Sequence, residues 1–237
     1  MQSSAATSLP APLTGISSMA TRQLLAELTA AFTERIGRAV AVESVGGVDA
    51  AKRVQAGESF DVVVLASDAI AKLVDAGQLR ADSVTNLVHS GVAVAVRSGT
   101  PQPDIATEDA VRQAVLATPT LSYSTGPSGV ALAKLFEHWG IAAHIKDRIV
   151  TAPPGVPVGS LVARGEVALG FQQLSELIHV DGITIVGPLP PAIQITTTFT
   201  AAMTTCCTRP AEVQALLDFM ASPDTAAAKR RQGMEPV

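Results

Sequence analysis

The first 77 residues repeat one pattern three times: a mostly apolar segment of strand length, a turn of small residues, and a helix-length segment with apolar residues at helical spacing. The strand-length segments lie at 13–16, 39–44 and 60–65. The third, FDVVVL, is almost continuously apolar, which is typical of a strand covered on both faces. This alternation predicts an α/β fold with mostly parallel sheets. In such sheets ligands bind at the carboxyl ends of the strands, where these turns fall.

The stretch 121–140, LSYSTGPSGVALAKLFEHWG, shows the same pattern in the second half of the chain. A short strand leads into a turn rich in hydroxyl groups, and a helix follows that ends near Gly140. Such a turn presents free backbone N–H groups and the positive end of the helix to one point in space. This geometry favours a small anion as ligand. The alternative is that Ser128 only caps a core helix.

Composition and charge exclude several classes of function. The 237 residues suffice for one large domain or two lobes of about a hundred residues each. A net charge of −4 gives no basic surface for nucleic acid, and no apolar run reaches the roughly 18 residues that membrane insertion needs. The chain has no GxSxG, P-loop, Cys/His cluster or Rossmann glycine pattern. We therefore predict no cofactor, no metal, no nucleic-acid partner and no membrane insertion.

The N-terminal segment 1–8, MQSSAATS, lacks the charged and apolar regions of a signal peptide. It resembles the start of a mature exported protein in which a methionine replaces the signal. We therefore expect a periplasmic location. A native cytoplasmic start is the alternative.

The order of these segments resembles the molybdate-binding branch of the type II periplasmic solute-binding proteins. The resemblance covers nearly the whole chain and rests on an ordered succession: two serines after the first strand, a small-residue turn after the second, DVVVLAS, SYSTGPSG, and LVARGEVALGFQQLSE followed by VGPLP. It implies two α/β lobes with an anion in the cleft between them, and an ABC permease as partner. Lobe I would comprise 12–88 plus 195–237 and lobe II 89–194, joined by crossover strands near 87–92 and 192–198.

Carried over by position, the resemblance also implies a ligand shell made of strand ends and helix starts from both lobes. Its members would be Ser17, Ser18, Gly46, Gly47, Ala66 and Ser67 from lobe I, and Ser124, Ser128, Gly129, Pro157, Val158 and Gln172 or Gln173 from lobe II.

One departure from the family pattern concerns the ligand. Molybdate sites in this family are uncharged and often have a serine after the second strand, where this chain has Gly46 and Gly47. Lys52 and Arg53 follow in the next helix. Glycines leave room and cations suit carboxylate oxygens, so we expect a larger organic polycarboxylate. The alternative is that both cations belong to an ordinary solvated helix face.

Within the same branch the sequence also resembles the aconitate isomerases, which exchange cis- and trans-aconitate. That resemblance implies an allylic proton shift, which needs a base and donors for the developing charge. His89, next to the predicted crossover, is the first candidate base and Tyr123 the second. A structural histidine and a core tyrosine are their alternatives. Glu43 and Asp49 are weaker candidates because negative charge opposes a tricarboxylate. The competing function is a non-catalytic receptor that delivers molybdate or another small anion to an ABC permease.

Overall fold

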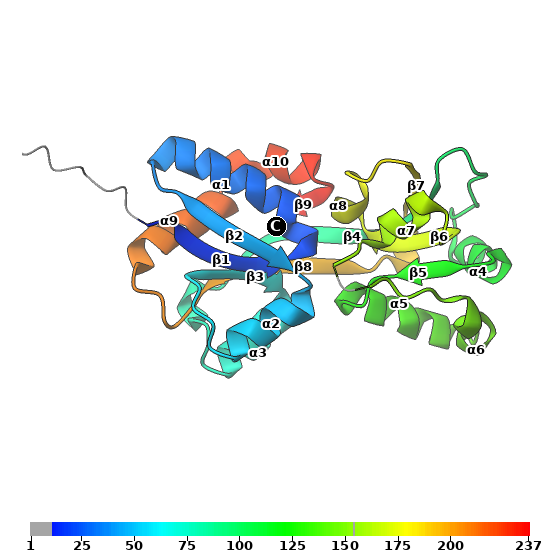
Figure 1. The fold of residues 1–237 in the computed structure, drawn as a ribbon, viewed down its shortest axis with the longest axis horizontal. Helices are drawn as coiled ribbons and strands as arrows, with labels where there is room; N and C mark the ends of the chain where they lie inside the picture. Colours follow the sequence, from blue (N-terminus) through cyan, green and yellow to red (C-terminus); the bar gives the residue numbers. More distant parts are fainter. Residues whose placement is uncertain (1–10, 154) are drawn as a thin grey trace, which may run out of the picture.

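The computed structural model describes residues 11–153 and 155–237, so the predicted lead-in at 1–8 lies outside the described residues. Figure 1 shows two groups of helices and strands side by side along the longest axis. Two strands, β4 (Thr85–Arg97) and β8 (Thr196–Met203), run through both groups. The predicted α/β fold is confirmed. None of the helices in the described ranges is long and apolar enough to cross a membrane.

The first half contains the three predicted repeats in order. Its elements are β1 (Leu13–Ser18), η1 (Met19–Thr21), α1 (Arg22–Ile36), β2 (Val40–Val45), α2 (Gly47–Gln55), β3 (Val62–Ala66), α3 (Ser67–Asp75) and η2 (Ala81–Ser83), completed by the returning α9 (Pro210–Ala221), η5 (Pro223–Thr225), α10 (Ala226–Arg231) and β9 (Met234–Pro236). Helix α1 buries a stripe that includes Leu24, Leu28 and Phe32. It ends at Gly37, whose φ of 75° is a left-handed conformation that favours glycine.

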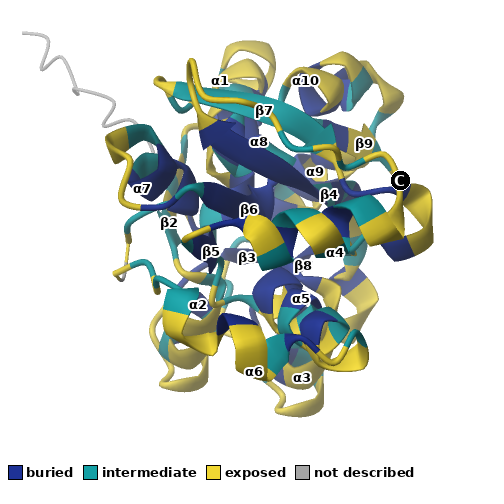
Figure 2. Cartoon of the chain, turned by 90° about the vertical axis from the view of Figure 1, so that its right-hand side faces the viewer, coloured by how far each residue is buried: buried dark blue, intermediate teal, exposed yellow. Residues whose placement is uncertain are grey.

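The second half holds the remaining elements. These are α4 (Glu108–Ala117), β5 (Leu121–Tyr123), α5 (Pro127–His138), α6 (Ala142–Ile145), η3 (Lys146–Arg148), α7 (Val158–Arg164), β6 (Leu169–Gln173), α8 (Leu174–Leu177), β7 (Ile183–Pro188) and η4 (Pro191–Ile193). Figure 2 views this half end on and shows buried strands beneath helices whose outer faces are exposed. The strand and helix that the sequence predicts within 121–140 are both present, as β5 and α5.

The sheet is mixed rather than mostly parallel, which corrects one detail of the prediction. Its order is β2-β1-β3-β8-β4-β6-β5, with β7 and β9 also paired to β4. The pairs β1–β2, β1–β3 and β5–β6 are parallel, whereas every pair that involves β4 or β8 is antiparallel. The reason is that the chain leaves the first half along β4 and returns along β8. These two neighbours therefore run in opposite directions.

The two largest apolar clusters lie in different halves. One joins β1, α1, β3, β8 and α9, and the other joins β4 after Gly91 to α4, α5 and β6. Most members are aliphatic, with Phe32 and Phe199 in the first cluster and Phe136 and Phe171 in the second. The clusters divide close to the predicted lobe boundaries at 88–89 and 194–195, which remain a prediction.

Candidate functional site

The serines that end β1 meet the end of the neighbouring strand. Ser17 pairs in register with Ser44 of β2, and their Oγ atoms lie 2.8 Å apart. Ser17 is fully buried. The Ser18 side chain accepts a hydrogen bond from the Ala20 N–H at 3.3 Å and so caps η1. The sequence prediction missed Ser44, although it stands in the second strand opposite Ser17 in a parallel register.

The predicted glycine turn lies beside these serines. Gly46 precedes α2 and Gly47 begins it. A Cβ atom added to Gly47 would lie 3.7 Å from the Ser18 Oγ. In the same way Ala66 precedes α3 and Ser67 begins it, and neither helix has a side-chain cap. The first N–H groups of α2 and α3 therefore open at the carboxyl edge of the sheet where β1 ends, which is an arrangement that suits an anion.

Arg53 is engaged on the protein surface rather than free for a ligand. Its Nη1 lies 2.6 Å from Glu43 Oε1, and its Nε lies 2.6 Å from Glu58 Oε2. The guanidinium also lies over the Phe60 ring, 5.5 Å from its centroid. The hydrogen bond from Arg53 lowers the pKa of Glu43. This network favours the alternative in which Arg53 belongs to a solvated helix face.

Lys52 lies on the outer face of α2. Ala50 and Val54, which are buried, lie two positions to either side of it, and Lys52 itself is exposed. Residues two apart on a helix point in nearly opposite directions. The argument for a polycarboxylate from these two cations therefore loses its structural support.

In the second half, two hydroxyl groups meet at the start of α5. The Oγ atoms of Ser124 and Ser128 lie 3.0 Å apart. Gly126 precedes α5, and Pro127 occupies its first position, where its missing N–H costs nothing. Gly129 packs directly on the turn, because a Cβ atom there would lie 1.5 Å from the backbone oxygen of Ser124. The small residues of this turn therefore allow the strand end to fold tightly onto the helix start.

The two predicted glutamines make different contacts. The Gln172 Oε1 accepts a hydrogen bond from the Gly159 N–H at 3.2 Å, directly after Pro157 and Val158 at the start of α7. Gln173 contacts the crossing strands instead. Its amide lies 2.9 Å from Thr197 Oγ1, and turning the amide over also places its nitrogen 2.7 Å from Ser90 Oγ. Gln172 therefore joins the α7 start, while Gln173 ties β6 to the crossover.

The two predicted catalytic residues have internal partners. His89 Nδ1 lies 3.0 Å from Thr198 Oγ1 on the returning strand β8. The half-buried ring of Tyr123 packs edge-on against Phe136 with centroids 5.8 Å apart, and burial raises the pKa of Tyr123. These contacts favour the structural alternatives for both. Their catalytic role remains a prediction.

Glu176 is a candidate that the sequence prediction missed. It lies in α8, and its Oε1 accepts a hydrogen bond from Gln172 Nε2 at 2.9 Å. Burial raises the pKa of Glu176 to about 7, although the bond from Gln172 acts in the opposite direction. Helix α8 packs against η1, which Ser18 caps. No local pattern pointed to Glu176, because Gln172 lies in β6 and Glu176 in α8, and only the turn between the strand and the helix brings the two side chains together.

The raised pKa of Glu176 predicts a pH-dependent effect on stability. The folded protein favours the protonated carboxyl, so this contribution to stability is present at low pH and is lost as the pH rises from about 4.5 to about 7. We expect Glu176→Gln to match the wild type in free energy of unfolding at pH 4.5 and to exceed it at pH 8. Denaturant unfolding at both values measures this. Glu34→Gln, at an exposed carboxyl on α1, is the control, and an equal difference at both pH values for Glu176→Gln would contradict the assignment.

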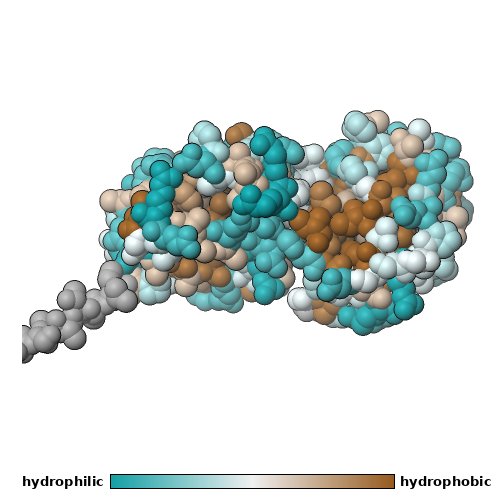
Figure 3. Space-filling model, turned by 90° about the horizontal axis from the view of Figure 1, so that it is seen from above, coloured by the Kyte–Doolittle hydropathy of each residue, from teal (hydrophilic) through white to brown (hydrophobic). Residues whose placement is uncertain are grey.

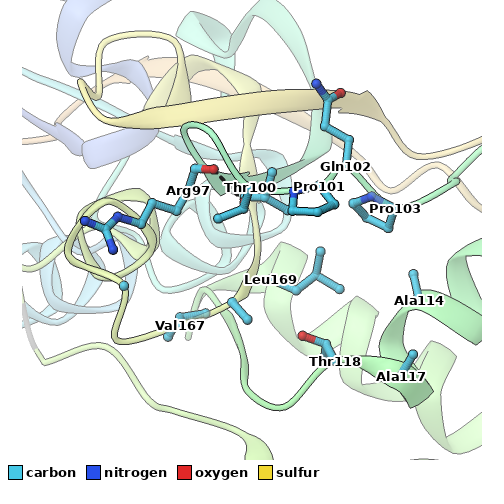
Figure 4. Close-up of a pocket in the computed structure, with 13 residues that line it drawn as sticks. Arg97, Thr100, Pro101, Gln102, Pro103, Ala114, Ala117, Thr118, Val167 and Leu169 are labelled. Carbon is cyan, nitrogen blue, oxygen red and sulfur yellow. Dashed lines mark hydrogen bonds between the residues drawn. The ribbon is translucent and has the colours of Figure 1, made fainter.

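Two hollows of the surface lie away from these turns or include only part of them. One, of about 600 Å³, lies at the outer end of the second half, and Figure 4 shows Arg97, Thr118 and Leu169 among its lining residues. Figure 3 shows that apolar side chains gather on the second half, next to a largely hydrophilic first half. A smaller one, of about 450 Å³, lies between α1 and β2 and includes Arg22 and Ser44. No group of three His, Cys, Asp or Glu side chains within residues 11–153 and 155–237 could hold a metal ion.

Comparisons with known proteins identify the family and the fold. A family model described as bacterial extracellular solute-binding protein matches residues 13–235. An aconitate isomerase from Pseudomonas sp. is 42% identical over 188 residues, which cover 78% of this chain and 71% of that protein. The periplasmic molybdate-binding protein of Azotobacter vinelandii superposes with a TM-score of 0.78 over 94% of this chain and 98% of that one, at 20% identity. The sulfate-binding protein SubI of Mycobacterium tuberculosis gives 0.76 over 96% and 88%, at 15% identity.

Proposed function

The chain belongs to the bacterial extracellular solute-binding protein family, and we propose that it binds a small tricarboxylate between its lobes and converts cis-aconitate to trans-aconitate. The observation that carries this proposal is the 42% identity to an aconitate isomerase over most of both chains. The hydroxyl groups and helix starts at the strand ends of both halves support an anionic ligand. The lobes are 12–88 plus 195–237 and 89–194.

The reaction moves one proton and one double bond within the substrate. A base removes a proton from the methylene carbon, the double bond shifts by one position, and the proton returns to the former alkene carbon. Negative charge develops in between and spreads into the adjoining carboxylates. Donors fixed before the reaction stabilise such charge most effectively. In this proposal the donors are Ser18, Ser124 and Ser128 and the free N–H groups at the starts of α2, α3 and α5, with Lys52 and Arg53 left outside.

A second candidate function has its own support. The fold is shared with the molybdate-binding and sulfate-binding proteins named above, and the turns at the strand ends carry hydroxyl and N–H donors that suit such anions. Under this candidate the protein is a periplasmic receptor that hands a small anion to an ABC permease and catalyses nothing. Membership of the family supports a small-anion ligand and a periplasmic location for both candidates.

A ligand screen combined with a turnover assay separates the two candidates. The purified protein is incubated with cis-aconitate, trans-aconitate, molybdate or sulfate, and the thermal midpoint and the ratio of aconitate isomers are measured. We expect aconitate to raise the midpoint, because a ligand that binds only the folded state stabilises it, and we expect isomers to interconvert. Stabilisation by molybdate or sulfate without interconversion would favour the receptor instead.

A further inference from the structure

We propose that the carboxylate of Glu176 is the base that moves the proton during this isomerisation. The inference rests on the proposed function, because it names the acid–base group of the same site. It differs from the sequence prediction, in which His89 and Tyr123 are the candidates.

The first argument is that a chain of hydrogen bonds joins Glu176 to the start of α7, which belongs to the proposed ligand shell. The N–H of Gly159, which follows Pro157 and Val158, donates to Gln172 Oε1, and Gln172 Nε2 donates to Glu176 Oε1. A glutamine amide fixed at both ends holds the carboxyl in one orientation. The second carboxyl oxygen of Glu176 has no hydrogen-bond partner within residues 11–153 and 155–237, so it remains available for a substrate proton.

The second argument is the position of α8 between the halves. Figure 1 shows α8 at the junction of the two groups, next to β9. The helix packs against η1, and Leu174 at its start contacts Gly233 of the C-terminal segment, where a Cβ atom would lie 2.8 Å away. Because Ser18 caps η1 and a Cβ atom on Gly47 would lie 3.7 Å from the Ser18 Oγ, α8 packs beside the element that carries the proposed lobe I donors.

The third argument is the ionisation of Glu176 and its surroundings. Burial raises its pKa to about 7, close to the value at which a general base works best near neutral pH. Among the elements that pack on α8, η1 and β6 carry no ionisable side chain, β4 carries His89 and Arg97, and the C-terminal segment before Gly233 carries Lys229, Arg230 and Arg231. His89 bonds to Thr198, and Arg97 lines the outer hollow. No ion pair within 4 Å of Glu176 is present among the described residues.

The step balances without any further reactant. The Glu176 carboxylate accepts the proton from the methylene carbon of cis-aconitate, and the electron pair of that C–H bond forms the new double bond. The electron pair of the old double bond delocalises into the carboxylate on the former alkene carbon. That carbon then takes the proton from the Glu176 carboxyl. Glu176 returns to its starting charge, and the product is trans-aconitate.

Glu176→Gln tests the assignment, because the amide keeps the shape and its oxygen can still accept from Gln172. We expect kcat to fall by about 10²–10⁴-fold, which is the usual contribution of a positioned acid or base, while KM changes only a few-fold. Calorimetry should show that the variant still binds trans-aconitate. The wild-type kcat/KM should rise with pH and level off above about pH 7, since only the carboxylate is active. Glu166→Gln, at an exposed carboxyl paired with Arg164, is the matched control and should behave as the wild type.

Each outcome decides a different question. If the wild type interconverts the isomers and Glu176→Gln does so within about threefold of its rate, the assignment of Glu176 is overturned and the proposed function stands. If the wild type shows no interconversion between pH 6 and 9, both fail. If Glu176→Gln does not fold, Glu176→Asp replaces it: a lower kcat with the wild-type pH profile supports the assignment, and an unchanged kcat overturns it.

Discussion

Gly129→Ala is expected to lower the free energy of unfolding by about 1–3 kcal/mol or more and to abolish ligand binding. The reason is steric, because the new Cβ would lie 1.5 Å from the backbone oxygen of Ser124 and 2.6 Å from its carbonyl carbon. Backbone atoms cannot yield as a flexible side chain does, so the turn before α5 has to move. The bond between the hydroxyl groups of Ser124 and Ser128 would then break. Denaturant unfolding and calorimetry with aconitate measure the two effects.

Gly126→Ala, three residues earlier, is the control for stability. A Cβ atom there meets nothing within 4 Å, and the φ of −81° suits alanine. This variant should unfold within about 0.5 kcal/mol of the wild type, as uninvolved surface substitutions do. If Gly129→Ala were equally stable, the close contact between the turn and α5 would be wrong.

Gly47→Leu is expected to weaken aconitate binding by roughly 100-fold, a loss that a small misplacement of a substrate can cause. Gly47 begins α2 next to Ser18, and the added side chain would occupy the space that the proposed site gives to a carboxylate. Stability should not fall, because Gly47 has no positive φ and leucine favours a helix more than glycine does. Calorimetry and thermal unfolding measure both quantities on the same sample.

Val48→Leu is the matched control for this variant. Val48 is 51% exposed and lies one position further along α2, so an added methylene group there should change neither affinity nor stability. Unchanged affinity in Gly47→Leu would show that the ligand does not reach the start of α2. The lobe I part of the proposed site would then be wrong.

The local pattern of the sequence predicted the elements well, because strand ends, turns and helix starts depend on neighbouring residues. The helix that ends at Gly37 and the turn at 124–129 are examples. The direction in which β4 and β8 run in the sheet could not be predicted from the local pattern. Both are long strands with suitable composition, and only the route of the chain between the halves makes them antiparallel.

The sequence predicted which turns lie next to one another, but not the contacts that their side chains make. Serines and glycines at strand ends predict an anion site. In the structure, Ser18 and Gly47 lie next to each other, and Ser17 lies beside Ser18. The charge of Arg53 was misleading. In the sequence Arg53 looked free to bind a ligand, but in the structure it pairs with Glu43 and Glu58. Glu176 resembles an ordinary helix residue in the sequence, but in the structure burial raises its pKa to about 7, and Gln172 donates a hydrogen bond to its carboxyl.

The most direct test of the whole account is the proton NMR spectrum of cis-aconitate incubated with the purified protein in D₂O. The account predicts that trans-aconitate appears, because the Glu176 carboxylate moves a proton from the methylene carbon to the former alkene carbon. Deuterium on the methylene carbon of the product would report how far the Glu176 carboxyl exchanges its proton with the solvent between the two transfers. A spectrum that stays that of cis-aconitate would contradict the account.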